Sequence, residues 1–169
     1  HELMLHMPME PNGRNDPGPG ALTVSMPDAE LRQKLLVALE SFGGYVGINN
    51  HMGSRFTANR PDMELVMRQL KPRGLMFLDS RTSVKSCGPR VARELGVPVA
   101  QNQFFLDTST RPADVAAALE QVRAAAHRDG SAIAIGHVHW RATAEALAAA
   151  VPKFLEEGLE FVPVSAFVR

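Results

Sequence analysis

The sequence predicts an α/β fold with a parallel sheet, because short apolar segments of strand length alternate with longer helix-like segments. Consecutive strands that are joined by helices form right-handed crossovers and therefore run parallel. No Gly-x-Gly-x-x-Gly or Walker-type loop follows the first strand, so the fingerprints of nucleotide-binding sheets are missing. We therefore expect a (β/α) barrel, formed by a single domain over residues 1–169.

The expected strands are apolar, and most of them follow a glycine or a Pro-Gly cluster. They are Glu2–Leu5, Tyr45–Asn49, Leu75–Asp79, Val97–Gln101, Ala132–Gly136 and Glu160–Val164. The expected helices alternate with them and are Pro27–Ser41, Pro61–Lys71, Pro89–Leu95, Pro112–Arg128 and Ala142–Glu157. Four of these helices open with proline, whose missing N–H costs nothing in the first helical turn. In a barrel of this kind, function is expected at the carboxyl ends of the strands.

The composition of the chain disfavours nucleic acid as a partner. Eighteen Lys and Arg residues balance eighteen Asp and Glu residues, so no basic excess is available for nucleic acid or an anionic membrane. No apolar run approaches the roughly 20 residues that a membrane-spanning helix needs. Cys87 is the only cysteine, so it cannot form an internal disulfide, and no obvious base lies beside it in the sequence.

The end of the second strand is unusually polar. Alternation along the strand places Asn49 and His51 on the face that points toward the barrel mouth. A lone histidine is more often structural than functional, but Asn50 and Arg55 extend the polar stretch, which favours a functional interpretation of His51.

His6 is a second candidate for metal binding, because it lies at the end of the first strand. Pro8 and Pro11 exclude a helix here, so His6 and Glu10 can converge only through a turn.

Two further strand ends carry residues with catalytic chemistry. His137 and His139 follow the fifth expected strand, and imidazole titrates near neutral pH, so either side chain can serve as a general acid. A purely structural hydrogen bond is an equal alternative for His139 and a weaker one for His137. Asp79 and Arg81 either brace the rim together with Arg55, or orient a catalytic histidine and bind substrate oxygens; the two interpretations are about even.

Four segments in this order resemble the divergent polysaccharide deacetylase family. They are His-Met-Pro-Met-Glu-Pro from His6, Gly-Ile-Asn-Asn-His-Met-Gly-Ser-Arg from Gly47, Phe-Leu-Asp-Ser-Arg-Thr from Phe77 and Ile-Gly-His-Val-His from Ile135. The resemblance runs essentially from end to end. It implies an irregular (β/α) barrel of the polysaccharide deacetylase type. It also implies the chemistry of the wider superfamily, in which one Asp and two His bind a divalent metal, a second Asp acts as base and a late-strand His acts as acid.

The resemblance assigns roles position by position. His6 matches the first metal-binding histidine, whereas the second falls on Glu10, so we favour His51 as the replacement ligand in a set of His6, His51 and Glu10. The Asp-Asp pair of the first metal-bearing strand is expected upstream of His1. His137 matches the late-strand acid, and His139 has no clear counterpart in the superfamily.

The resemblance therefore predicts a hydrolase that removes acetyl groups from a cell-envelope polysaccharide. Zn²⁺ is the expected cofactor, although Ni²⁺, Co²⁺ or Mn²⁺ suit the same ligands, and the site is expected to be incomplete in this chain. The expected catalytic residues are His137, Asp79 and Arg81, and the expected substrate-binding residues are Asn49, Asn50, Arg55 and His139. The expected location is the periplasm or cell exterior, with a targeting segment or membrane anchor upstream. The rival prediction is a catalytically silent barrel that binds glycan or an envelope protein.

Overall fold

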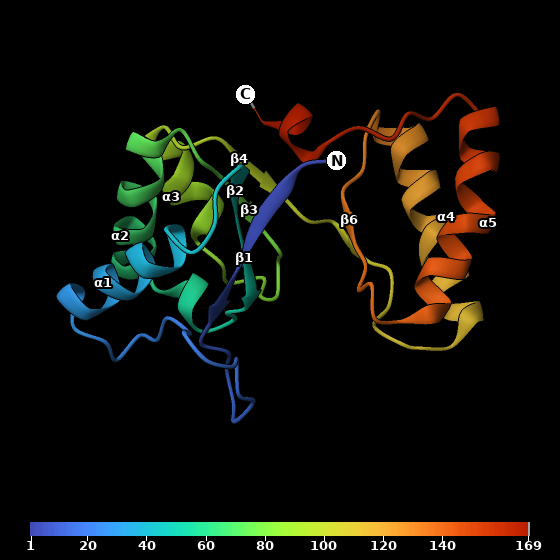
Figure 1. Ribbon diagram of the computed structural model, residues 1–169. Helices are drawn as coiled ribbons and strands as arrows, with labels where there is room; N and C mark the ends of the chain where they lie inside the picture. Colours follow the sequence, from blue (N-terminus) through green and yellow to red (C-terminus); the bar gives the residue numbers. More distant parts are fainter. Residues whose placement is uncertain (169) are drawn as a thin grey trace. The chain divides into compact units, whose positions relative to one another are not determined.

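Strands and helices alternate along residues 1–168, which are the residues that the computed structural model describes (Figure 1). Contacts between them divide the chain into two units. Unit 1 comprises residues 1–101 together with the C-terminal segment from Pro163, and unit 2 comprises Asn102–Val162. The expectation of a single domain stays a prediction.

Unit 1 is built on a four-stranded parallel sheet with the order β1-β2-β3-β4. Its strands are β1 (Leu3–Met9), β2 (Tyr45–Met52), β3 (Met76–Asp79) and β4 (Val99–Gln101). Its helices are α1 (Asp28–Leu39), α2 (Arg60–Leu70) and α3 (Gly88–Leu95), with short 3-10 turns η1 (Phe56–Ala58), η2 (Lys71–Arg73) and η3 (Val164–Phe167). Because all four strands run parallel, their carboxyl ends lie at one edge of the sheet.

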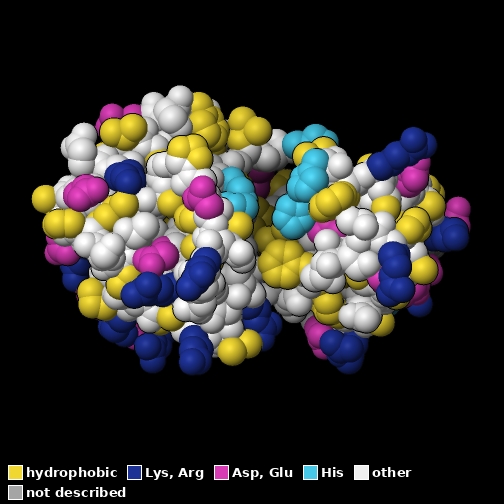
Figure 2. Space-filling view, turned by 90° about the horizontal axis from the view of Figure 1, so that it is seen from below, with side chains coloured by type: hydrophobic (Ala, Val, Ile, Leu, Met, Phe, Trp, Pro, Cys, Tyr) yellow, Lys and Arg dark blue, Asp and Glu magenta, His cyan; other side chains and the backbone are white. Residues whose placement is uncertain are grey.

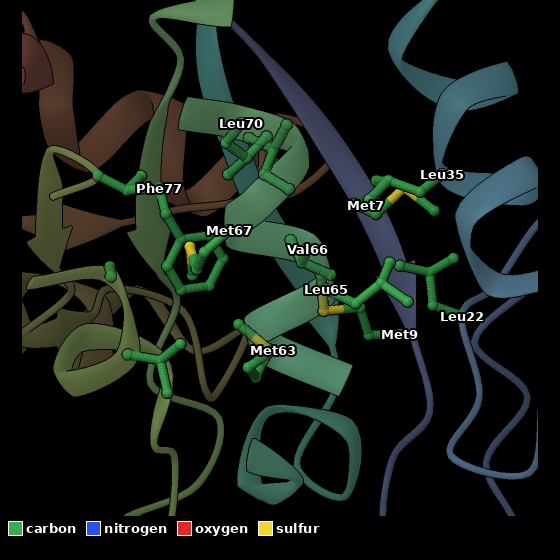
Figure 3. Close-up of a cluster of buried hydrophobic side chains, with 14 of the residues drawn as sticks. Met7, Met9, Leu22, Leu35, Met63, Leu65, Val66, Met67, Leu70 and Phe77 are labelled. Atoms are coloured by element: carbon green, nitrogen blue, oxygen red, sulfur yellow. The ribbon is translucent and has the colours of Figure 1, made fainter. Parts of the chain in front are cut away.

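The hydrophobic core of unit 1 lies between the sheet and helices α1, α2 and α3, which cover the same face (Figure 1). Alternate residues of β1, namely Leu5, Met7 and Met9, are buried in this core, whereas His6 between them is exposed. Figure 3 shows side chains from β1, α2 and β3 in one cluster, among them Met7, Met67 and Phe77. The alternation along β1 therefore leaves His6 on the face of the sheet that the three helices do not cover.

Helix α2 begins with a combination of residues that favours helix initiation. The Asn59 side chain accepts a hydrogen bond from the backbone N–H of Asp62 (3.3 Å), and Pro61 occupies the first turn. Asp62 itself is buried, and its Oδ2 atom has no hydrogen-bond partner among the described residues. Burial raises the pKa of Asp62 above its ordinary value, and the nearby Asp28 and Glu10 carboxylates raise it further.

Replacing Asp62 by asparagine is therefore expected to remove a pH-dependent loss of stability. A carboxyl whose folded-state pKa is raised favours the folded state below its unfolded-state pKa, and this contribution is lost as the pH rises through the folded value. Relative to wild type, the free energy of unfolding of Asp62→Asn should increase as the pH rises from 3.8 to neutrality. Urea denaturation across this range measures the difference.

The control for this prediction is Glu30→Gln, which removes an exposed carboxylate from the first turn of α1. The free energy of unfolding of Glu30→Gln should depend on pH in the same way as that of wild type. A constant difference in the free energy of unfolding between Asp62→Asn and wild type across this pH range would contradict the prediction.

Unit 2 pairs two short parallel strands with two long helices. Strand β5 (Phe104–Phe105) pairs with β6 (Ala134–Ile135), and α4 (Pro112–Asp129) lies beside α5 (Arg141–Glu156) (Figure 1). Leu106, Leu119 and Phe154 form the centre of its core, and small alanine side chains of both helices pack around them. The ends of β5 and β6 thus lie side by side, which places the residues that follow each strand near one another.

The predicted α/β class with a parallel sheet is confirmed, and each of the five expected helices is found within two residues of its predicted bounds. The strand expected at Glu160–Val164 is wrong: residues 159–163 form no strand, and Val164 begins η3. Pro163 has no N–H to donate, and Phe161 and Val162 are exposed, so this apolar stretch does not pair in a sheet. Within residues 1–168 no helix is both long and apolar enough to cross a membrane.

Candidate functional site

The imidazole rings of His6, in the middle of β1, and His51, near the end of β2, meet on one face of the sheet. The two strands are neighbours, and their register pairs His6 with Asn49 and Pro8 with His51, so both histidines lie on one face. The Nε2 atom of His6 lies 3.0 Å from the Nδ1 atom of His51, and the ring centroids are 4.9 Å apart. The carboxyl end of β1 points downward in Figure 1, and Figure 2, seen from below, shows histidine side chains (cyan) at the surface.

The geometry of this pair suits two ligands of one metal ion. With Zn–N bonds of about 2.0–2.1 Å in a tetrahedral site, two ligand nitrogens are separated by roughly 3.3 Å. The observed 3.0 Å between the two imidazole nitrogens is close to that separation. However, the described residues contain no cluster of three or more His, Cys, Asp or Glu side chains that could hold a metal ion. Within residues 1–168, the pair could supply two ligands of a metal ion but not a complete set.

Glu10, which the sequence suggests as a third ligand, is used elsewhere. Its Oε2 atom accepts a hydrogen bond from the backbone N–H of Val24 (2.7 Å), and its Oε1 atom pairs with the Arg55 guanidinium (2.8 Å). Its backbone carbonyl accepts from the N–H groups of Arg55 and Phe56, each at 3.1 Å. Glu10 thus ties the loop after β1 to the turn after β2. Arg55, an expected substrate-binding residue, is held in the same ion pair.

Asn50 ties the end of β2 to the end of β3. It is buried, and its Oδ1 atom accepts a hydrogen bond from the backbone N–H of Ser80 (2.8 Å). Its Nδ2 atom donates to the carbonyl of Met52 (2.7 Å), which also accepts from the hydroxyl of Thr82 (2.7 Å). Asn50 therefore holds the end of β2 against the end of β3, and its expected contact with substrate stays a prediction. Its neighbour Asn49 lies on the opposite face with His51 and donates to Ser80 Oγ (3.2 Å).

Asp79 is the last residue of β3 and lies in the interior of the protein. Its side chain is completely buried, and its two oxygens accept hydrogen bonds from the Arg81 backbone N–H (2.7 Å) and the Ser86 hydroxyl (2.6 Å). Arg81 adopts a left-handed backbone with φ of 55°, which is uncommon for a residue with a side chain, and it is exposed. Asp79 thus holds the turn that presents Arg81, while Arg55 pairs with Glu10 instead; the roles expected for Asp79 and Arg81 stay predictions.

The turn after β2 is held closely against β1. Gly53 has φ of 86°, and a Cβ atom added there would lie 2.9 Å from Cβ of Met9. Thr57 donates its hydroxyl and its backbone N–H to the carbonyl of Gly53, each at 2.8 Å. Only glycine fits this left-handed, crowded position, so Gly53 holds the chain close to β1 directly after the strand that carries His51.

In unit 2, a buried carboxylate orients His137. Asp107 follows β5, and its Oδ1 atom lies 2.7 Å from Nδ1 of His137 at the end of β6. Its Oδ2 atom accepts from the His137 backbone N–H (2.5 Å) and from the Thr143 hydroxyl (2.8 Å). Burial alone would raise the pKa of Asp107, but the hydrogen bonds from His137 and Thr143 outweigh it and lower that pKa. Asp107 is therefore ionised at neutral pH, and it engages the backbone N–H and the Nδ1 atom of His137.

Replacing Asp107 by asparagine is expected to change how acid destabilises the protein. A carboxyl with a lowered folded-state pKa contributes stability that is complete above its ordinary value of 3.8 and is lost as the pH falls through the folded value. Asp107→Asn should lower the free energy of unfolding at neutral pH by about 1–3 kcal/mol and flatten this acid loss. Urea denaturation at neutrality and at several pH values below 3.8 measures both effects.

The control here is Asp16→Asn, which removes an exposed loop carboxylate. The free energy of unfolding of Asp16→Asn should depend on pH as that of wild type does. An unchanged acid transition in Asp107→Asn would show that Asp107 does not carry this contribution.

A short turn presents the residues that follow His137. The backbone N–H of Trp140 donates to the carbonyl of His137 (3.1 Å), so residues 137–140 form a closed turn directly before α5. The ring of His139 lies between the other two rings, with centroids 5.5 Å from His137 and 4.7 Å from Trp140. Val138 and Trp140 are exposed. His139 is thus the middle ring of an exposed row.

Sequence reasoning missed Asp107, which is the direct partner of His137. The signal is faint: an acidic residue follows the apolar run Phe104-Phe105-Leu106, in the way that Asp79 follows Phe77-Leu78. Two residues are too few for a clear strand pattern, so the position of Asp107 at a strand end was not recognised.

The chain matches proteins of one family along its whole described length. A family model described as "Divergent polysaccharide deacetylase" matches residues 1–168. The chain is 37% identical over 139 residues to the uncharacterised protein YibQ of Escherichia coli (strain K12), covering 82% of this chain and 44% of YibQ. It is 39% identical over 139 residues to an uncharacterised protein of Haemophilus influenzae, covering 80% of this chain and 49% of that protein. The chain thus spans about half the length of the curated relatives it matches.

A solved structure has the same fold. The crystal structure of the uncharacterised protein ATU2773 from Agrobacterium tumefaciens C58 superposes with a TM-score of 0.94 at 30% sequence identity. The match covers 99% of this chain and 69% of that one. This likeness is consistent with the barrel-like polysaccharide deacetylase fold that the sequence predicts.

Proposed function

The chain belongs to the divergent polysaccharide deacetylase family, and on that premise we propose that it is a metal-dependent hydrolase that removes acetyl groups from a cell-envelope polysaccharide. The observation that carries the proposal is the imidazole pair of His6 and His51 on one face of two neighbouring strands. The two nitrogens lie at hydrogen-bond distance (3.0 Å), and the rings are accessible, since His6 is exposed and His51 is half-buried. Their chemistry suits a divalent transition metal.

In this proposal, His6 and His51 supply two nitrogen ligands, and a carboxylate from outside residues 1–168 supplies a third. Zn²⁺ is the metal that we propose, because imidazole and carboxylate ligands suit it. A divalent cation held there would polarise the acetyl carbonyl as a Lewis acid. Glu10 is not part of the proposed set, since both of its carboxylate oxygens are engaged by Val24 and Arg55.

His137 is the residue that we propose for proton transfer. Hydrolysis forms a bond between a water oxygen and the acetyl carbon, and it breaks the bond between that carbon and the sugar nitrogen or oxygen. The water gives up one proton to a base, which we propose is a carboxylate from outside residues 1–168. The leaving atom gains one proton from Nε2 of His137 in its doubly protonated form, whose Nδ1–H donates to Asp107 (2.7 Å). Asp107 acts as a positioning residue: its hydrogen bonds to the ring and backbone of His137 fix the direction in which Nε2 points.

A second candidate function is a catalytically silent module that binds glycan or an envelope protein. One observation favours it: where the superfamily has a second metal-binding histidine, this chain has Glu10 in an ion pair with Arg55 (2.8 Å). A barrel that has exchanged a ligand for a structural ion pair can keep its fold and lose its chemistry.

Two measurements on the full-length protein separate these candidates. We expect one divalent metal ion per chain by elemental analysis, and metal-dependent release of acetate from acetylated envelope glycans. Binding of glycan with neither metal nor acetate release would favour the silent module. The proposed envelope location is tested by fractionation of cells that express the native protein, where recovery in the cytoplasm would contradict it.

A further inference from the structure

The turn that follows β6 displays apolar side chains beside the proposed acid. Val138 is 95% exposed and Trp140 is 39% exposed, although both are large and hydrophobic. Single exposed hydrophobic residues are common on protein surfaces and need no explanation. These two flank His139 within four consecutive residues, and the first of the four is His137.

The backbone of this turn is fixed at both ends. At its start, the N–H of His137 donates to the buried Asp107 carboxylate (2.5 Å). At its end, the N–H of Trp140 donates to the carbonyl of His137 (3.1 Å), and the Trp140 carbonyl accepts from Thr143 in the first turn of α5 (3.1 Å). Trp140 is therefore presented by a rigid segment, which lowers the entropy lost when a ligand binds.

The rings form a row that leads away from His137. The His139 ring contacts the Trp140 ring at 4.7 Å between centroids, and the His137 ring lies 5.5 Å from His139. An exposed indole has a broad apolar face and a polar N–H edge. A pyranose ring has the complementary character, because its axial C–H groups form an apolar face and its hydroxyl groups form a polar rim.

We infer that Trp140, with Val138 beside it, is a stacking platform for a pyranose ring of an acetylated polymer, and that His139 contacts the polar rim of that sugar. This inference rests on the proposed function, and it selects a sugar polymer over a small acetylated metabolite as the substrate. A small acetyl compound would need only the groups at the reacting bond. A platform several ångströms along the row binds a neighbouring part of a larger substrate.

Trp140 provides its own reporter, since it is the only tryptophan among the 169 residues. The probe is tetra-N-acetylchitotetraose, an acetylated pyranose oligomer, and N-acetylglycine is the small-molecule control. In the full-length protein, the fluorescence of wild type minus that of Trp140→Phe isolates the Trp140 signal. We expect a saturable change with the oligomer and none with N-acetylglycine. No change with the oligomer at millimolar concentration would overturn the inference.

Calorimetric titration supplies the second arm. Trp140→Ala should bind the oligomer about 10-fold more weakly, the size expected for loss of one aromatic contact, whereas Trp140→Phe should retain most of the affinity. Phe42→Ala, which removes an exposed aromatic ring from unit 1, is the matched control and should bind as wild type does. Equal affinity of Trp140→Ala and wild type would overturn the platform.

Kinetics distinguish this inference from the proposed function. With the oligomer as substrate, Trp140→Ala should raise KM about 10-fold and leave kcat and metal content unchanged. Acetate release with an unchanged KM in Trp140→Ala would refute the platform and leave the hydrolase intact. Oligomer binding that depends on Trp140 in a protein that releases no acetate would support the platform and refute the hydrolase.

Discussion

Replacing His51 by alanine is expected to abolish metal binding and, with it, acetate release. His51 and His6 present nitrogens 3.0 Å apart, and no other His, Cys, Asp or Glu side chain of residues 1–168 joins them in a metal-sized cluster. Removing one imidazole therefore leaves a single ligand from this part of the chain. Loss of an outer-shell partner alone lowers metal affinity by about 10–100-fold, so loss of a ligand should lower it by more than about 100-fold.

The measurement is metal content after dialysis, together with the melting temperature with and without added Zn²⁺. A bound metal stabilises the folded state, so Zn²⁺ should raise the melting temperature of wild type and not of His51→Ala. His6→Ala should behave in the same way, and the double variant should be no worse, because either change already destroys the pair. The control is His127→Ala, which removes an exposed imidazole paired with Glu157 (3.0 Å). A His51→Ala protein with a full complement of metal would contradict the prediction.

That His6 and His51 lie on one face could be predicted from the sequence because it depends on strand periodicity, although β1 runs on to Met9 and does not end at Leu5 as expected. In a parallel sheet, alternate residues share a face, and the apolar residues Leu5 and Met7 fix which face of β1 is buried. The same regularity accounts for the five helices, whose proline and asparagine starts are local signals. Regular segments with local start signals therefore gave reliable predictions.

The surroundings of the pair could not be predicted, because they depend on loops. Glu10 is engaged by the backbone of Val24, 14 residues away, and by Arg55, 45 residues away. No periodic pattern brings these groups together. Asn50 is a similar case: it is polar and sits at a strand end, yet it is buried and bonded to the backbone of Ser80, 30 residues along the chain. Polar residues at strand ends thus include residues that only hold the backbone together as well as residues that bind a ligand. Their hydrogen-bond partners distinguish the two kinds.

Replacing His137 by alanine is expected to lower kcat by about 10²–10⁴-fold while metal content stays at the wild-type level. The reason is the separation of roles: Nδ1 of His137 is held by Asp107 at 2.7 Å, and Nε2 remains for the leaving atom. A general acid stabilises the transition state and contributes little to ground-state binding, so KM should change much less than kcat. The measurement is steady-state acetate release, with elemental analysis of the same samples.

Asp107→Asn distinguishes a role of Asp107 in positioning His137 for catalysis from a role in stability alone. Asparagine can still accept a hydrogen bond from Nδ1 of His137, but its uncharged amide offers only one accepting oxygen where Asp107 uses two, one for the ring and one shared by the His137 N–H and Thr143. The ring should then be less firmly oriented, so kcat should fall while oligomer affinity is preserved. His127→Ala again serves as the imidazole control and should retain wild-type kcat. Metal content should stay unchanged in His137→Ala, because removing a proton donor leaves His6 and His51 in place. Loss of metal from this variant would instead identify His137 as a metal ligand.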